Sequence, residues 1–368
     1  VARLRAAPQL AALLPSEASP TTQEPVGALL DRLRLAYPEL GNLLTLRSSN
    51  LESLRTHLKP DQVLLAYYPT GEGLWLVGLG RQGAFSRQVV LTPERLQELC
   101  RKGPDPESLR ALNDLLIEPV HEQLASASQL LIVPTGALWK VPFQALQDQQ
   151  GRCLSQRWSA SQLTSGDLLR LADGQWRELP RGRRVMLGAP PAAQLPGAEV
   201  ELRRISRLLP GSELRLGAEA KSSVLLAGEP IALLHLATHA QFVPGAPMQS
   251  GLMLQDGTFN LSQLHRLRLQ PGAMVVLSCC EGGMGNDTPG AEPVSLAGSL
   301  SAAGASTLVA NLWKVDDEAA LVFFTDFYAS LAREESVHQA FRTGQQACRR
   351  SFPQPRDWGG FCLIGDPR

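Results

Sequence analysis

The chain has few cysteines, no net charge and no long apolar run, and each of these absences excludes a class of protein. Its six cysteines in 368 residues include no CxxC pair, which indicates a reducing compartment rather than a disulfide framework. We find no run of about 18 apolar residues, the length that a membrane-spanning helix needs. Lysine plus arginine and aspartate plus glutamate both number 35, so no overall field attracts nucleic acid or an anionic membrane. We therefore expect a cytoplasmic protein that binds neither nucleic acid nor a membrane directly.

The rest of the composition is typical of a globular protein with a substantial core. Apolar residues make up 44% of the chain and charged residues 19%. A length of 368 residues is enough for one large domain or two ordinary ones. Val1 is not an initiator residue, so the natural N-terminus and any signal on it can lie upstream.

Two short apolar runs each end at a reactive side chain. Residues 231–238 lead into His239, and residues 273–278 lead into Cys279 and Cys280. Such runs are typical of strands that are buried on both faces of a parallel sheet, because no alternate residue is left for water. In sheets of this kind, ligands and chemistry lie just beyond the carboxyl ends of the strands. The sequence therefore predicts that a histidine and a cysteine meet over one cleft.

The order of the expected elements predicts an α/β protein, a three-layer α/β/α sandwich with a mostly parallel central sheet. Residues 1–60 have leucines at helical spacing and predict a helical N-terminal segment. The polar, arginine-rich stretch at residues 174–184 is the best internal boundary. It separates a first unit over residues 61–175 from a second unit over residues 180–368.

Several individual elements can be predicted within these units. Residues 63–68 and 74–79 flank a glycine-containing turn and predict a hairpin. Residues 106–125 carry one apolar stripe and predict a single helix. Asp316 has the position of a helix N-cap, and a turn is expected at residues 271–272, before the second apolar run.

His239 and Cys280 are the candidate pair for nucleophilic chemistry. A thiol attacks as the thiolate, so it needs an imidazole or a positive dipole nearby. The glycines at positions 282 and 283 would let a backbone N–H approach a developing oxyanion. We interpret Cys279 as a small buried hydrophobic residue, with a redox or persulfide role as the alternative.

Five motifs occur in a serial order that is more specific than any one of them alone. They are His235-Leu-Ala-Thr-His239, Ser250-Gly-Leu-Met-Leu-Gln-Asp-Gly257, Val276-Leu-Ser-Cys-Cys-Glu281, Ala303-Gly-Ala-Ser306 with Leu312-Trp-Lys-Val-Asp-Asp317, and Trp358-Gly-Gly-Phe-Cys-Leu-Ile-Gly-Asp366. In this order they resemble the motifs of CHAT domains, which are caspase-like proteins of the caspase, separase and gingipain superfamily. Further matches upstream extend the likeness over roughly residues 50–368. The resemblance implies a tandem caspase-like fold, in which a degenerate unit precedes a catalytic one.

Carried over residue by residue, the resemblance implies that His239 and Cys280 are catalytic. Cys280 directly precedes Glu281, as in the Ser-Ala-Cys-Glu pattern of the family. The backbone N–H groups of Cys280 and of the residue after the histidine would form the oxyanion hole. That residue is usually glycine and is Ala240 here, which retains its N–H and fits if its φ suits a side chain. The resemblance implies no third triad carboxylate, and we expect no metal and no cofactor.

Acidic residues near the expected cleft are candidates for lining the substrate pocket. They are Asp256, Glu281, Asp287 and Glu292. One of them would suit a basic substrate side chain, as the resemblance to separase and gingipains implies, whereas a caspase-type preference for aspartate would need an arginine. Helix capping or loop solvation is the alternative for Asp256 and the preferred interpretation for Asp316 and Asp317.

A metal site is a further alternative at the same place. His235 and His239 are four residues apart and, together with the cysteines, offer ligands for zinc. The spacing lacks the paired CxxC or the HExxH that would make this interpretation specific. We therefore interpret His235 as a buried strand histidine with a hydrogen-bond partner.

These observations together predict a regulated cysteine endopeptidase that cleaves a partner protein, with bacterial defence or programmed cell death as the candidate setting. The first unit lacks a matching pair, because His121 lies in an expected helix and Cys153 in a loop. By analogy with the family, a sensor partner or the N-terminal helical segment would control activity. The alternative is a catalytically inactive caspase-like scaffold that binds other proteins.

Overall fold

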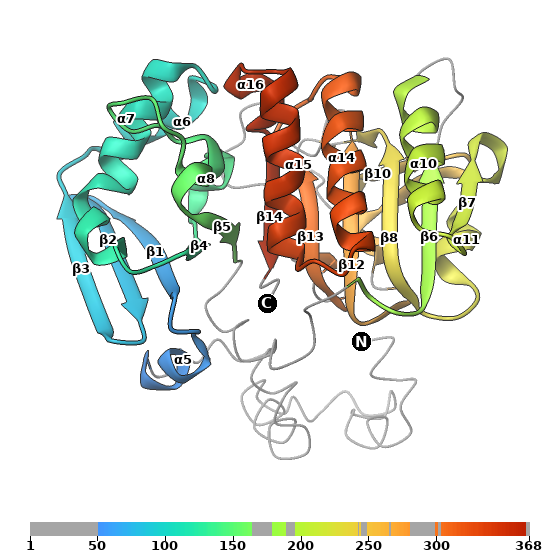
Figure 1. The fold of residues 1–368 in the computed structure, drawn as a ribbon, viewed down its shortest axis with the longest axis horizontal. Helices are drawn as coiled ribbons and strands as arrows, with labels where there is room; N and C mark the ends of the chain where they lie inside the picture. The colour runs from blue at the N-terminus through green and yellow to red at the C-terminus, as the bar shows by residue number, and fades with distance from the viewer. Residues whose placement is uncertain are drawn as a thin grey trace, which may run out of the picture. The chain divides into compact units, whose positions relative to one another are not determined.

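The computed structural model describes residues 51–163, 179–188, 196–241, 243, 249–264, 266–279, 299–300 and 303–365. Residues 51–368 form one compact unit, which is drawn in Figure 1. The expected N-terminal helical segment lies outside the described residues except at its end, where the helix α5 spans Leu51–His57.

Strands and helices are interspersed along the described chain. The strands are β1 (Gln62–Thr70), β2 (Gly73–Gly80), β3 (Gly83–Val89), β4 (Gln129–Val133), β5 (Ser159–Gln162), β6 (Arg183–Gly188), β7 (Glu213–Leu216), β8 (Ile231–Thr238), β9 (Ala240–Gln241), β10 (Gly251–Leu254), β11 (Gly257–Asn260), β12 (Leu269–Cys279), β13 (Ala305–Asn311) and β14 (Phe361–Gly365). The α-helices after α5 are α6 (Pro93–Arg101), α7 (Pro106–Leu116), α8 (Leu154–Arg157), α10 (Pro196–Leu208), α11 (Ser222–Leu226), α12 (Leu261–Leu264), α14 (Asp317–Ala332), α15 (Val337–Ser351) and α16 (Pro355–Trp358).

Eleven of these strands form one sheet, in the order β3-β2-β1-β4-β5-β14-β13-β12-β8-β6-β7. The strands β1, β4, β5 and β14 pair in parallel, and so do the strands from β13 to β7. The pairs β1–β2, β2–β3 and β13–β14 are antiparallel. This mostly parallel sheet confirms the predicted fold class, and the expected hairpin is confirmed as β1–β2.

The two apolar runs form neighbouring strands in the middle of the second half of the sheet. β8 is buried at every position, as expected for a strand covered on both faces. β12 pairs with it in parallel up to the partners Cys279 and Thr238. The turn expected at residues 271–272 is absent, because β12 runs through them with a shift of register before Met274. Gly272 absorbs this irregularity with a φ of 79°, which glycine adopts without strain.

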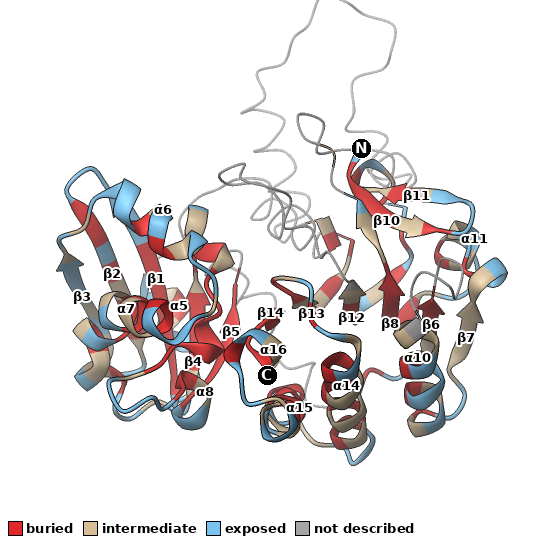
Figure 2. Cartoon of the chain, turned by 90° about the horizontal axis from the view of Figure 1, so that it is seen from above, coloured by how far each residue is buried: buried red, intermediate tan, exposed pale blue. Residues whose placement is uncertain are grey.

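Layers of different kinds cover the two faces of these strands. Figure 2 shows α10, α14 and α15 along one face, and β10, β11 and α11 on the opposite side. Alternate residues of β8 and β12 supply the two cores, with Leu233 and Val276 on the helical side and Leu234 and Leu277 on the other. The strands β9, β10 and β11 form a separate antiparallel sheet of three strands.

The expected helix boundaries were correct where a cap marks them. Asp316 is the N-cap of α14, and its carboxylate accepts a hydrogen bond of 2.9 Å from the N–H of Glu318. The single helix expected over residues 106–125 is wrong, because α7 ends at Leu116 and residues 118–124 form a 3-10 helix. Pro119 explains the break, since it lacks an N–H and its ring clashes with the preceding turn of an α-helix.

The two expected units share the sheet. β5 belongs to the range 61–175 and β14 to the range 180–368, and the two strands pair in parallel at Gln162 and Ile364. The division into a degenerate and a catalytic caspase-like unit stays a prediction.

A buried histidine links the same two parts of the chain. Nδ1 of His338 on α15 lies 2.7 Å from the hydroxyl oxygen of Ser159 on β5. Burial lowers the pKa of His338 from 6.5 to about 3, with help from the positive charges of Lys59 and Arg342 and opposition from Asp61.

His338 is expected to make stability depend on pH. Below pH 6.5 the unfolded chain binds a proton that the folded chain does not bind until about pH 3, so the free energy of unfolding falls as the pH falls through this window. At about 1.36 kcal/mol per pH unit, the His338 contribution between pH 7 and pH 5 is a loss of about 2 kcal/mol. The variant His338→Asn, which places an amide near Ser159, should lose correspondingly less. Urea unfolding at both pH values checks this, and equal losses in the two proteins would contradict it.

Candidate active site

His239 lies directly beyond the carboxyl end of β8, as predicted. Its side chain is partly exposed, and its backbone carbonyl accepts a hydrogen bond of 2.8 Å from the N–H of Met253 on β10. Within the described part of the chain, no residue forms a hydrogen bond or ion pair with the imidazole of His239. The described residues therefore supply no third triad carboxylate.

The candidate nucleophile Cys280 lies outside the described residues, as do the pocket candidates Glu281, Asp287 and Glu292. The backbone of Cys279, the residue before Cys280, ends β12 and is the partner of Thr238, the residue before His239. The register thus aligns the last residues of two adjacent parallel strands, and both candidate residues follow this level.

The pairing of β9 with β10 determines the direction of the N–H of Ala240. Met253 and His239 share a ladder hydrogen bond, so the neighbouring partners Leu252 and Ala240 form a non-hydrogen-bonded pair. The N–H of Ala240 therefore points away from β10. Among the described residues other than glycine, only Glu334 has a positive φ, so Ala240 has a conformation that suits a side chain.

Asp256 has a structural partner at the tip of the β10–β11 hairpin. Its carboxylate accepts hydrogen bonds from the N–H of Ser222 at 2.9 and 3.1 Å and from the Ser222 hydroxyl at 2.7 Å. These hydrogen bonds lower the pKa of Asp256 against the opposing effect of desolvation, which is the largest single influence. The contacts match the capping alternative, since Ser222 begins α11.

His235 lies on β8, four residues before His239, and belongs to a buried network of polar side chains. Its ring is fully buried, with Nε2 2.8 Å from Oε1 of Glu201 and Nδ1 2.9 Å from the hydroxyl of Tyr328. The hydroxyl of Ser278 donates to Oε2 of Glu201 over 3.0 Å. The interpretation of His235 as a buried histidine with a hydrogen-bond partner is confirmed.

The sequence analysis missed Glu201, although a signal for it exists. Glu201 is only 3% exposed and lies on the same face of α10 as the buried residues Leu202 and Ile205. A carboxylate on an apolar helix face costs free energy unless a partner satisfies it. A histidine inside an apolar strand poses the same problem, so each residue indicates the other.

The structure shows no sign of a metal site or a membrane span in the residues that it describes. No group of three or more potential ligand side chains comes together there, and His235 uses both ring nitrogens on Glu201 and Tyr328. No described helix is both long and apolar enough to cross a membrane.

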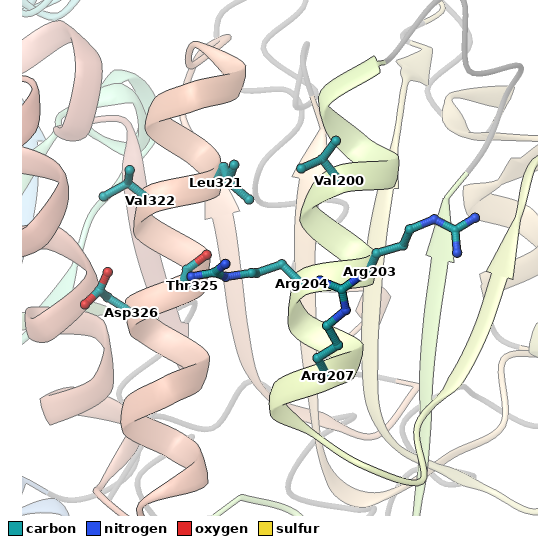
Figure 3. A pocket seen from close by; sticks show the side chains of 8 residues that line it. All are labelled: Val200, Arg203, Arg204, Arg207, Leu321, Val322, Thr325 and Asp326. Carbon is teal, nitrogen blue, oxygen red and sulfur yellow. The ribbon is translucent and has the colours of Figure 1, made fainter.

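A groove of about 490 Å³ lies between α10 and α14, and none of the site residues that the structure describes lines it. Figure 3 shows the two helices as its walls. The lining residues are Val200, Arg203, Arg204, Arg207, Leu321, Val322, Thr325 and Asp326. His239, Ala240 and Asp256, the site residues that the structure describes, therefore lie outside the groove.

Comparison with known proteins gives one family match and several similar proteins. The model of the CHAT domain family matches residues 106–366. Human tetratricopeptide repeat protein 28 is 26% identical over 347 residues, which cover 76% of this chain and 14% of that protein. The mouse protein of the same name is 27% identical over 325 residues, which cover 70% and 13%. The chain thus spans about a seventh of the length of these relatives.

Two solved structures resemble the chain in fold. In the separase–securin complex of Saccharomyces cerevisiae, a likeness with a TM-score of 0.56 and 11% identity covers 86% of this chain and 31% of that chain. The Arg-specific cysteine proteinase gingipain R matches with a TM-score of 0.47 and 9% identity, over 74% of this chain and 69% of that chain. The family match and the likeness to separase together confirm the expected caspase-like fold.

Proposed function

Because this chain belongs to the CHAT domain family, we propose that it is a cysteine endopeptidase with a dyad of His239 and Cys280. The observation that carries the proposal is the register of β8 and β12. Thr238 and Cys279 are direct partners, so the register aligns the two residues that precede the imidazole of His239 and the thiol of Cys280 in the sequence. This is the placement that a thiol nucleophile and its base require.

The proposed reaction proceeds through a thioester. The Cys280 thiol gives its proton to His239, and the thiolate attacks the carbonyl carbon of the scissile peptide bond. The C–N bond breaks as the imidazolium of His239 protonates the leaving amine. His239 then takes a proton from a water molecule, which attacks the thioester, and the released thiolate regains that proton. The N–H of Ala240, which points away from β10, and that of Cys280 would stabilise the oxyanion.

The pocket that selects the substrate would include acidic residues. Glu281, Asp287 and Glu292 follow the nucleophile in sequence and are proposed to receive a basic side chain of the substrate. The contacts of Asp256 with Ser222 favour a structural role for that residue instead. The substrate is proposed to be a partner protein.

Control by a partner is also part of the proposal. The similar region of tetratricopeptide repeat protein 28 occupies only 14% of a protein that is named for its repeats, and the similar separase was solved with securin. We propose that a sensor protein or a helical segment that includes residues 1–60 holds this site inactive in the cytoplasm, in a defence or cell-death response.

The first test is mass-spectrometric profiling of a peptide library with this chain and with Cys280→Ala, with and without calcium. We expect cleavage after one residue type, a basic one, by the unchanged chain and not by the variant. A peptide with an electrophilic C-terminal group should label Cys280 covalently. The absence of both cleavage and labelling would contradict the peptidase and favour the binding scaffold.

A further inference from the structure

Glu201 connects the two strands that lead to the proposed dyad. Its oxygen Oε1 lies 2.8 Å from Nε2 of His235 on β8, and its oxygen Oε2 accepts the Ser278 hydroxyl of β12 over 3.0 Å. We propose that Glu201 is a positioning residue, whose carboxylate holds the ends of β8 and β12 so that His239 and Cys280 face each other. This inference rests on the function proposed above.

The spacing along the strands makes such an effect direct. Ser278 is two residues before Cys280 and His235 is four residues before His239 in the sequence, so both hydrogen-bonded side chains are close to the proposed dyad along the chain. Ser278 is the partner of Ala237, and side chains two residues apart share a face. His235 and Ser278 therefore project to the same side of the sheet, toward α10.

Each buried polar side chain of this network has a hydrogen-bond partner. His235 is fully buried and Glu201 is 3% exposed, so an unpaired charge at either position would be costly. Burial raises the pKa of Tyr328 well above its ordinary value of 10.0, and the charge of Glu201 adds to this effect. Tyr328 thus remains a phenol, with its hydroxyl 2.9 Å from Nδ1 of His235, while Nε2 of the same ring lies 2.8 Å from Glu201.

The packing of two helices holds the carboxylate of Glu201 in place. Glu201 is on α10 and Tyr328 is on α14, two helices that pack against each other over β8 and β12 (Figure 1). The ring of Phe324 on α14 meets His235 edge to face with centroids 5.0 Å apart. The carboxylate is therefore held by rigid elements, which is what the positioning of reacting groups requires.

A substitution at Ser278 can distinguish an effect on the position of the nucleophile from an effect on folding stability. Its hydroxyl is only partly buried and makes one hydrogen bond to the network, so its loss should cost about 0.5–1.5 kcal/mol of stability. A misplacement of the nucleophile by about 1 Å can cost about 100-fold in rate. The effect on catalysis should therefore exceed the effect on folding.

The experiment compares Ser278→Ala with Ser306→Ala as a matched control. The Ser306 hydroxyl donates over 3.1 Å to the carbonyl of Gly272, near the other end of β12. We expect Ser278→Ala to lower kcat about 10- to 100-fold with KM within about 2-fold, and Ser306→Ala to leave both unchanged. Ser278→Thr retains the hydroxyl and should restore kcat, and Glu201→Gln should lower it at least as much as Ser278→Ala.

A second readout keeps the inference separate from the proposed function. The pH profile of Cys280 alkylation by iodoacetamide should shift toward that of a free thiol, about pH 8.5, in Ser278→Ala and not in Ser306→Ala. If peptides are cleaved and the two variants behave alike, the positioning role is overturned and the peptidase stands. If there is neither cleavage nor labelling by the electrophilic peptide but the iodoacetamide profile shifts as expected, the peptidase is overturned and the positioning role stands. Equal profiles without cleavage overturn both.

Discussion

Replacing His239 with alanine is expected to lower kcat/KM for a cleaved peptide about 1,000-fold or more. The imidazole is proposed to take the thiol proton and return it to the leaving amine, and general acid–base catalysis of this kind contributes about 100- to 10,000-fold. The free energy of unfolding should change by less than about 0.5 kcal/mol, because the side chain is partly exposed and has no partner in the described part of the chain. Steady-state kinetics and urea unfolding measure the two effects.

A double variant tests whether the two residues act as one unit. If His239 serves Cys280, the variant with both replaced by alanine should be no slower than Cys280→Ala alone. His121→Ala is the matched control, since this partly exposed histidine lies in the 3-10 helix over residues 118–124 and should leave turnover unchanged. Retention of most activity in His239→Ala would contradict the assignment of the base.

Replacing Phe323 with alanine is expected to lower the free energy of unfolding by about 3–5 kcal/mol, the usual cost of removing a buried aromatic ring. The ring is fully buried on α14 and stacks on Phe361 of β14 with centroids 3.8 Å apart. It also meets Phe324 at 5.1 Å and Phe341 of α15 at 5.3 Å, both edge to face. A domain is usually stable by only about 5–15 kcal/mol, so the variant should be close to unfolding.

The conservative variant Phe323→Leu should lose roughly half as much stability, because leucine refills part of the cavity. Chemical denaturation with fluorescence detection measures both variants. A loss below about 1 kcal/mol in Phe323→Ala would show that helix α14 can repack without the ring, in contradiction to the aromatic cluster as the central contact between α14, α15 and β14.

The sequence predicted the central strands and their ends because the signal there is strong. Residues 231–238 and 273–278 are almost wholly apolar, a pattern that is typical of a strand buried on both faces at this length. The position of His239 beyond β8 follows directly from where the apolar run stops. The helix cap at Asp316 could also be predicted, because its side chain accepts a hydrogen bond from the first turn of the helix that follows it.

What could not be predicted depends on contacts between distant residues. Glu201 is separated from Ser278 and His235 in the sequence, and only packing of α10 on the sheet brings its two oxygens to both strands. The passage of β12 through Gly272 was missed because a Pro-Gly pair is typical of turns, and neighbouring strands overrode that local preference. The roles of Asp287 and Glu292 stay predictions, because these two residues lie outside the described part of the chain.

The pairing of β5 with β14 has a consequence for how the protein is made. The partners Gln162 and Ile364 are about 200 residues apart, so during synthesis on the ribosome β5 waits for its neighbour until nearly the whole described chain has emerged. Contacts of such sequence separation form slowly, and an unpaired strand edge is a site for association with other chains. The nascent protein therefore passes through a long interval in which its first half presents an open edge, and this is the stage at which chaperones would matter most.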